Sequence, residues 1–372
     1  MTKSKIVFIA NSSFYFYKFR HSLISTFITH GYEVALIAPK DEYSEKLSKF
    51  HCIELKNLDR KSMNPLKDIA LLMELYFKIK KEKAAIVFSF TIKPNIYAAL
   101  VCKVLGVKIV PSITGLGYLF IQNDQKLIHN LIKRLYSFAF KVPEKFIFQN
   151  SDDQALFIDK FKMDQSKCII TPGSGINLDF FKPLPLPKTN SFLMIARLLK
   201  DKGILEFIEA AEIVLKKVPD AKFTLIGPID ELNHAGISEK EFMQINKNNS
   251  ISYLGEKQDV VPFLKECNCF VLPSYREGTP RTNLEAMAMG RPIITTDVPG
   301  CRGTVDEGKN GFLVPVRNAN ELAKAMIKFI DLPYNKKQAM GAYSRKKAEN
   351  EYDEKNVIKK YLELTKAILG DK

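Results

Sequence analysis

Short apolar runs alternate with segments of helical spacing along the whole chain, and this alternation constrains the fold more than any other feature. The first half holds runs of strand length that are apolar or rich in β-branched residues: Lys5–Ala10, Val34–Ala38, Ala85–Phe90, Lys108–Pro111 and Phe146–Gln149. Segments with the apolar spacing of helices lie between them: His21–His30, Leu66–Lys83, Asn95–Leu105 and Lys126–Lys141. Strand, helix and strand in this order indicate βαβ units and an α/β fold with a doubly wound parallel sheet.

The alternation stops at a proline-rich segment and then starts again. Lys182–Lys188 contains three prolines, which make a stiff, extended connector. Beyond it, the candidate strands are Ser191–Ile195, Lys222–Ile226, Ile251–Leu254, Cys269–Pro273, Pro292–Thr295 and Gly311–Val314. The candidate helices are Ile204–Lys217, Val260–Cys267, Thr282–Met289, Asn320–Asp331 and the long charged segment Asn335–Leu369.

We therefore predict two Rossmann-like domains. The first covers residues 1–183, and the second covers residues 184–351. The last helix, residues 352–372, is in a position to pack back onto the first domain. Ligands of parallel sheets bind at the carboxyl ends of the strands, so we expect the active site in a cleft between the two domains.

Composition and charge narrow the class of protein. The 372 residues are 46% hydrophobic and 26% charged, an ordinary globular balance, and no apolar run reaches the roughly 18 residues of a spanning helix. The first apolar run is too short for a secretory signal, so we expect a cytoplasmic protein. The six scattered cysteines lack the spacing of a zinc or redox site. Residues 1–187 carry 27 Lys and Arg against 16 Asp and Glu, which suggests an anionic partner: nucleic acid, a phosphorylated substrate or anionic lipid.

The segment from Pro273 to Gly290 carries the most chemical information. It begins at the carboxyl end of a candidate strand and enters a helix near Pro280, so that the backbone amides of residues 278–283 can face an anion. Glu277 and Glu285 can point into one pocket, where carboxylates accept hydrogen bonds from sugar hydroxyls. The alternative is an exposed loop followed by an ordinary glutamate in the first turn of a helix.

A second informative turn follows the first strand of the second half. Arg197 and Lys202 precede the next helix, and two cations there can hold a diphosphate and neutralise the charge that grows on a departing phosphate. The alternative is a solvated basic turn.

These motifs together resemble the retaining glycosyltransferases of family 4, which have the GT-B fold. The resemblance is strongest over residues 190–315, with Pro-Ser-x-x-Glu-Gly-x-Pro from Pro273 and Glu-Ala-Met-Ala-x-Gly from Glu285. In the first half, Ser89–Asn95 and Thr114–Tyr118 resemble the subgroup that builds bacterial surface polysaccharides and lipid-linked oligosaccharides, often with N-acetylated amino sugars.

The resemblance implies that the first domain binds the acceptor and that the second binds a nucleotide-sugar. It also implies a role for each matching residue of the donor site. Arg197 and Lys202 would hold the pyrophosphate of a UDP-sugar, and Glu277 would bind the donor sugar. Catalysis would depend on these three residues. The remaining donor-binding residues would be the following: Glu285 at the ribose, Gly278, Thr279 and Pro280 beside the sugar and phosphate, and the segment from Gly255 to Val260 beside the base.

The acceptor side departs from the family pattern. Many relatives have a glycine-rich loop after the first strand, but here no glycine occurs before Gly31. We therefore expect side chains to contact the acceptor: Asn11, Ser12 and Ser13 near the reacting groups, Arg20 at an acceptor phosphate, and Thr114 and Gly115 lining the site. For Arg20, a structural role on a helix surface is an equal alternative.

The resemblance also implies a reaction without a metal cofactor, and the sequence has neither an Asp-x-Asp motif nor histidines with ligand spacing. The UDP-sugar is a substrate. The departing phosphate would take the proton of the acceptor hydroxyl, so we name no catalytic base.

A basic amphipathic segment, Gln125–Lys145, and the charge of the first half favour contact with an anionic membrane, although a helix packed on the core would show the same pattern. We therefore predict a peripheral enzyme on the cytoplasmic face of the inner membrane. It would transfer an N-acetylhexosamine such as GalNAc from UDP to an undecaprenyl-diphosphate-linked saccharide, for O-antigen, capsule or protein glycans. The alternatives are transfer to a soluble acceptor, an epimerase of the same fold, and a basic nucleic-acid-binding protein, although no nucleic-acid motif is present.

Overall fold

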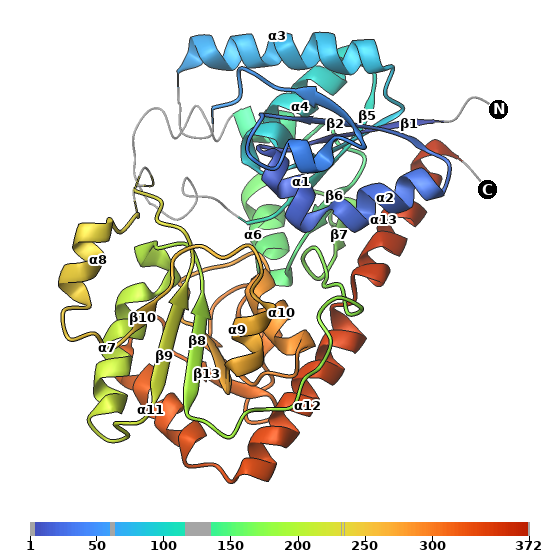
Figure 1. The fold of residues 1–372 in the computed structure, drawn as a ribbon. Coiled ribbons are helices and arrows are strands. Elements are labelled where there is room, and N and C mark those ends of the chain that lie inside the picture. The colour runs from blue at the N-terminus through green and yellow to red at the C-terminus, as the bar shows by residue number, and fades with distance from the viewer. Residues whose placement is uncertain (1–3, 60–63, 116–134, 232, 234, 371–372) are drawn as a thin grey trace. The chain divides into compact units, whose positions relative to one another are not determined.

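The computed structural model describes residues 4–59, 64–115, 135–231, 233 and 235–370. The chain divides into two compact units (Figure 1). Unit 1 comprises Met1–Ser174 and Lys355–Lys372, and unit 2 comprises Gly175–Glu354. Each unit is a parallel sheet with helices, the α/β architecture that the sequence predicts.

Unit 1 contains a seven-stranded sheet in the order β3-β2-β1-β4-β5-β6-β7, and every neighbouring pair is parallel. Its strands are β1 (Lys5–Ile9), β2 (Glu33–Ala38), β3 (His51–Glu54), β4 (Ile86–Phe90), β5 (Lys108–Ile113), β6 (Phe146–Phe148) and β7 (Cys168–Ile170). The sequence did not predict β3 and β7. Both are edge strands with no fully buried residue, so their apolar signal is weak.

Helices cover both faces of this sheet over two separate apolar cores. They are α1 (Ser13–Phe19), α2 (His21–Thr29), α3 (Pro65–Glu82), α4 (Ile92–Leu105), α6 (Ser151–Phe161) and α13 (Glu354–Leu369), with the short 3-10 turns η1 (Glu45–Leu47) and η3 (Gln165–Lys167). The helix expected over Lys126–Lys141 lies mostly outside the described residues. In the part that is described, residues 135–139 are helical.

Unit 2 contains a six-stranded parallel sheet in the order β10-β9-β8-β11-β12-β13. Its strands are β8 (Ser191–Ile195), β9 (Lys222–Ile226), β10 (Ser252–Tyr253), β11 (Cys269–Leu272), β12 (Ile293–Thr296) and β13 (Gly311–Val314). Its helices are α7 (Ile204–Leu215), α8 (Glu239–Ile245), α9 (Val261–Glu266), α10 (Arg281–Ala288), α11 (Ala319–Ile330) and α12 (Tyr334–Glu351), with the 3-10 turns η4 (Lys200–Lys202) and η5 (Arg302–Thr304).

The proline-rich segment packs on unit 2. The buried guanidinium of Arg291 donates hydrogen bonds to the carbonyl oxygens of Leu184 (2.9 Å) and Pro185 (3.2 Å). Phe181, just before the segment, is buried in the core of this unit. Unit 1 therefore ends at Ser174, ahead of the segment.

The charged segment Asn335–Leu369 forms two helices, α12 and α13, which separate close to residue 352, where we expect the last helix to begin. Where they separate, the backbone pairs with a distant segment instead of continuing the helix. Ile176 N donates to Tyr352 O (2.8 Å), and Glu354 N donates to Ile176 O (3.1 Å). After this interruption, Tyr361 of α13 enters the core of unit 1, and its hydroxyl lies 2.7 Å from Ser112 Oγ of β5.

Candidate active site

The expected donor residues lie where the strand order of unit 2 reverses. From β8, the chain adds β9 and β10 on one side and then crosses to place β11 on the other. Ligands of such sheets bind in the crevice outside the carboxyl ends of the strands at this point. The loops that leave β8 and β11 here are the two segments that carry Arg197, Lys202 and Glu277.

Backbone contacts hold these two loops together. Tyr275 N donates to Asp201 O at 2.8 Å, and Ser274 Oγ donates to the same oxygen at 3.2 Å. Gly203 has a φ of +77°, and a Cβ at this position would lie 2.2 Å from Pro273 O. A glycine is therefore required here for the loops to approach each other this closely.

Lys202 and Glu277 form an ion pair across the two loops, with Nζ 2.5 Å from Oε1. Both side chains are largely enclosed, since 19% of Lys202 and 16% of Glu277 is exposed. An ammonium group has three N–H donors, so Lys202 can hold the Glu277 carboxylate and still donate to an anionic ligand. Cys301 lies beside this pair, and burial raises the pKa of its thiol to about 12, which keeps it neutral.

The start of α10 follows Glu277 directly. Pro280 is the N-cap residue, no side chain caps the helix, and its first turn contains no acidic residue. The positive end of the helix dipole is therefore not neutralised by the helix itself, a suitable setting for a phosphate beside Gly278 and Thr279. Glu285, one turn into α10, pairs with Arg281 at 3.2 Å.

The other predicted donor residues are more distant from the pair or engaged elsewhere. Arg197 is half exposed and forms an ion pair with Asp230 at 2.9 Å, so it does not contact Glu277 in this conformation. Gly255 O accepts a hydrogen bond from Gly227 N (3.0 Å), which places its loop next to the end of β9. Val260 is the N-cap residue of α9 at the far end of that loop.

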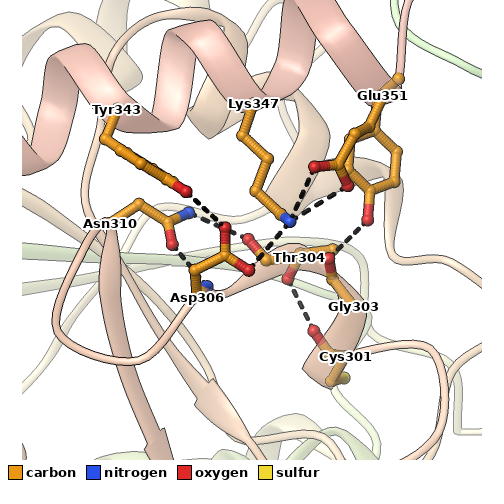
Figure 2. A network of polar contacts seen from close by, with 9 residues as sticks. Cys301, Gly303, Thr304, Asp306, Asn310, Tyr343, Lys347 and Glu351 are labelled. Carbon is orange, nitrogen blue, oxygen red and sulfur yellow. Dashed lines mark hydrogen bonds and ion pairs between the residues drawn. The ribbon is translucent and has the colours of Figure 1, made fainter.

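A partly buried polar network holds the loop that follows β12 (Figure 2). A Cβ at Gly300 would lie 2.3 Å from Glu277 O, so the loop after β12 packs directly against Glu277. Further along this loop, Asp306 accepts hydrogen bonds from Lys347 Nζ (3.1 Å) and the Tyr343 hydroxyl (2.9 Å) of α12. The network thus fastens the loop to α12.

In unit 1 the strand order reverses between β1 and β4, and the predicted acceptor residues follow β1 and β5. Ser12 and Ser13 are buried and engaged in local structure. Ser12 Oγ accepts from Tyr15 N and caps α1, a helix that the sequence did not predict, and Ser13 Oγ donates to Pro39 O at 3.0 Å. Asn11, just ahead of them, is half-buried.

Arg20 is only 2% exposed. Its guanidinium donates to the Tyr15 hydroxyl (3.1 Å) and lies over the rings of Phe90 (4.6 Å to the centroid) and Tyr361 (5.6 Å). Arg20 therefore does not lie on a helix surface but is a cation enclosed by aromatic rings, and its role at an acceptor phosphate stays a prediction.

Thr91 is a candidate that the sequence analysis did not single out. It follows β4 with a φ of +67° and a ψ of 165°, a region that β-branched residues rarely adopt. Its Oγ1 is buried and has no hydrogen-bond partner among the described residues. Thr91 lines a small pocket together with Ile92, Asn95, Ile113, Thr114, Gly115, Tyr136 and Phe157. The structure therefore brings Thr114 and Gly115 together with Thr91.

In the described part of the chain, no three His, Cys, Asp or Glu side chains gather as a metal site. In the same residues, no helix is both long and apolar enough to cross a bilayer.

Comparison with known proteins matches both units. The family described as "Glycosyl transferases group 1" matches residues 176–347, and the one described as "Glycosyl transferase 4-like" matches residues 5–150. The N,N'-diacetylbacillosaminyl-diphospho-undecaprenol alpha-1,3-N-acetylgalactosaminyltransferase of Campylobacter jejuni is 29% identical over 97% of this chain and 98% of its own. The UDP-Gal:alpha-D-GlcNAc-diphosphoundecaprenol alpha-1,3-galactosyltransferase of Escherichia coli is 29% identical over 73% of each chain.

Among solved structures, Anabaena HepE in complex with UDP and glucose superposes with a TM-score of 0.81 at 16% identity, covering 98% of this chain and all of that one. This likeness concerns the fold. Together with the two family matches, which lie one in each half of the chain, it leads to one assignment. Each half of the chain matches a glycosyltransferase family, so the chain is a glycosyltransferase with the GT-B fold, an enzyme that transfers a sugar.

Proposed function

We propose that this enzyme transfers an N-acetylhexosamine, GalNAc in the first instance, from a UDP-sugar to an undecaprenyl-diphosphate-linked saccharide with retention of configuration. The observation that carries the proposal is the enclosed Lys202–Glu277 pair at the reversal point of unit 2. The ammonium group of Lys202 can bind a diphosphate, and the neighbouring carboxylate of Glu277 can accept hydrogen bonds from sugar hydroxyls. The choice of GalNAc and of the acceptor is supported by the Campylobacter jejuni relative, an N-acetylgalactosaminyltransferase that acts on a diphospho-undecaprenol-linked sugar, and the choice of UDP by the Escherichia coli relative, which uses UDP-Gal.

In this proposal the residues of unit 2 bind the donor. Lys202 and the start of α10 at Gly278 hold the diphosphate, and Arg197 exchanges Asp230 for a phosphate oxygen when the donor binds. Glu277, fixed by Lys202, accepts hydrogen bonds from the donor sugar. Glu285 binds the ribose, and the loop from Gly255 to Val260 borders the uracil.

The chemical step requires the leaving UDP to carry more negative charge as the sugar–phosphate bond breaks. Lys202 and the helix dipole stabilise this charge, which accounts for a reaction without a divalent cation. The departing phosphate oxygen accepts the proton of the acceptor hydroxyl as the new glycosidic bond forms on the same face of the sugar. No residue of the chain is required as a base.

On the acceptor side, we place the saccharide at the carboxyl ends of β1, β4 and β5 in unit 1. Thr91, Thr114 and Gly115 line a pocket there, and Asn11 lies at the end of the neighbouring strand. Because the acceptor carries a polyprenyl chain, we propose that the enzyme works at the cytoplasmic face of the inner membrane.

A panel of nucleotide-sugars with an undecaprenyl-diphosphate-linked saccharide tests the proposal. We expect UDP-GalNAc to add the mass of one N-acetylhexosamine, an α-linkage in the NMR spectrum of the product, and full activity in EDTA. A β-linked product would contradict retention, and activity that depends on an added divalent cation would contradict the metal-free step. Transfer only to soluble sugars would contradict the lipid-linked acceptor.

A further inference from the structure

Helix α3 of unit 1 exposes a continuous apolar stripe. Four large side chains along it are largely accessible: Leu66 (76%), Ile69 (54%), Met73 (57%) and Phe77 (62%). Their spacing of three, four and four residues places them on one face of the helix. Figure 1 shows α3 along the outside of unit 1.

The fold of unit 1 does not require this stripe. The opposite face of α3 presents Leu71, Leu75 and Ile79, which are buried in the core of the unit. One apolar face is enough to attach a helix to a globular domain, and a helix that is apolar on a second face normally has a partner there.

The charged residues of α3 indicate the charge of the partner that would cover this stripe. Its three carboxylates are already paired: Asp68 with Lys93 (3.1 Å), Glu74 with Lys78 (2.6 Å) and Glu82 with Lys5 (3.3 Å). Lys80 and Lys81 are exposed, and neither forms an ion pair with a carboxylate of the described residues. They follow Phe77 by three and four residues, so they extend the apolar face with positive charge.

The net charge is distributed unevenly between the two units. Unit 1 contains 31 Lys and Arg against 17 Asp and Glu, a net charge of +14, whereas unit 2 contains 25 against 24, a net charge of +1. Almost the whole positive charge of the protein therefore lies on the unit that carries the stripe, and a negatively charged partner is favoured.

We propose that α3 is the surface through which the enzyme binds an anionic lipid bilayer, with Leu66, Ile69, Met73 and Phe77 inserted at the interface and the lysines at the head groups. The inference rests on the proposed function, because a polyprenyl-linked acceptor has to be met at a membrane. It assigns the contact to α3, whereas the sequence alone suggests Gln125–Lys145, about half of which lies outside the described residues. A second copy of the chain is a poorer partner, since pairing two such faces would bring like charges together.

Binding of the full-length protein to vesicles tests this surface without any sugar or acceptor present. Vesicles of equal parts phosphatidylcholine and phosphatidylglycerol are compared with vesicles of phosphatidylcholine alone in a sedimentation assay. We expect binding to the anionic vesicles, weakened by salt, and a loss of about tenfold or more in the triple variant Ile69→Gln, Met73→Gln, Phe77→Gln. Lys80→Gln with Lys81→Gln should reduce the preference for anionic vesicles.

The matched control replaces Phe180 and Met243, which are 63% and 65% exposed in unit 2, by glutamine. This control should bind vesicles like the wild type. The triple variant should keep wild-type transfer to a short-chain, water-soluble acceptor, which shows that it is folded and separates this inference from the proposed function.

Equal vesicle binding by wild type and triple variant would overturn the proposal, as would the absence of binding by the wild type. A concentration-dependent dimer that the triple variant loses, without vesicle binding by the wild type, would instead make this face an interface between copies.

Discussion

Lys200 and Lys202 occupy the same 3-10 turn, but their surroundings differ. Lys202 is enclosed and paired with Glu277, whereas Lys200 is 47% exposed and paired with Glu241. Only Lys202 is positioned to stabilise charge in a site from which water is partly excluded. We predict that Lys202→Met lowers kcat/KM by about 10²–10³ while the protein stays folded by circular dichroism.

The matched variant Lys200→Met should retain wild-type kcat/KM within about twofold. Equal losses in both variants would indicate a general effect of basic charge and would remove Lys202 from the site. Glu277→Gln should also lose transfer activity, because an amide cannot hold the Lys202 ammonium by charge.

Thr91 combines a strained backbone with a buried hydroxyl that lacks a partner. Thr91→Gly removes strain of about 1–3 kcal/mol, partly offset by about 1 kcal/mol of chain entropy, so this variant should be at least as stable as the wild type in urea unfolding. If the hydroxyl contacts the acceptor, the same variant has a raised KM for the lipid-linked saccharide. Thr91→Ser should keep the wild-type KM. A destabilised Thr91→Gly protein with unchanged kinetics would assign Thr91 a structural role only.

Among the elements, α12 stabilises the loop behind Glu277 through Asp306. Burial by itself would raise the pKa of Asp306, but hydrogen bonds from Lys347 and Tyr343 outweigh it and hold the pKa below its usual value. The resulting stabilisation is complete above the pKa of an unfolded aspartate, about 3.9, and is lost as the pH falls through the lower folded value.

We therefore predict that Asp306→Asn lowers the free energy of unfolding at pH 6 and that its difference from the wild type shrinks below about pH 4. Urea unfolding at several pH values measures this difference. Glu349→Gln, which removes an exposed carboxylate from the same helix, should change the free energy of unfolding by less than about 0.5 kcal/mol. A difference for Asp306→Asn that stays constant with pH would show that its ionisation does not contribute.

For the elements, the sequence was most informative where strands are central and buried. The apolar runs of β1, β4, β8 and β11 predicted these strands, because strands buried on both faces are continuously apolar. The backbone hydrogen bonds that Ile176 forms at the break between α12 and α13 could not be predicted, since Ile176 is distant in sequence. The positive φ of Thr91 could not be predicted, because threonine rarely adopts this backbone conformation. Lys202 and Glu277 are 75 residues apart in sequence, and they meet only because β8 and β11 are neighbours in the sheet.

On the scale of the whole molecule, each unit binds a different substrate in the proposed reaction. Unit 2 is nearly neutral and carries the candidate donor site, while unit 1 carries almost all the net charge, the candidate acceptor pocket and the exposed face of α3. A soluble diphosphate donor and a membrane-linked acceptor account for this division. The donor site is the most important part of this proposal, because each step starts from a diphosphate held in unit 2.

A crystal structure of the full-length enzyme with UDP tests the donor site most directly. The predicted result is a diphosphate at the carboxyl ends of β8 and β11, within hydrogen-bond distance of Lys202 Nζ and the Gly278 amide, with Arg197 turned from Asp230 toward a phosphate. UDP bound with its phosphates away from all three residues would contradict the account.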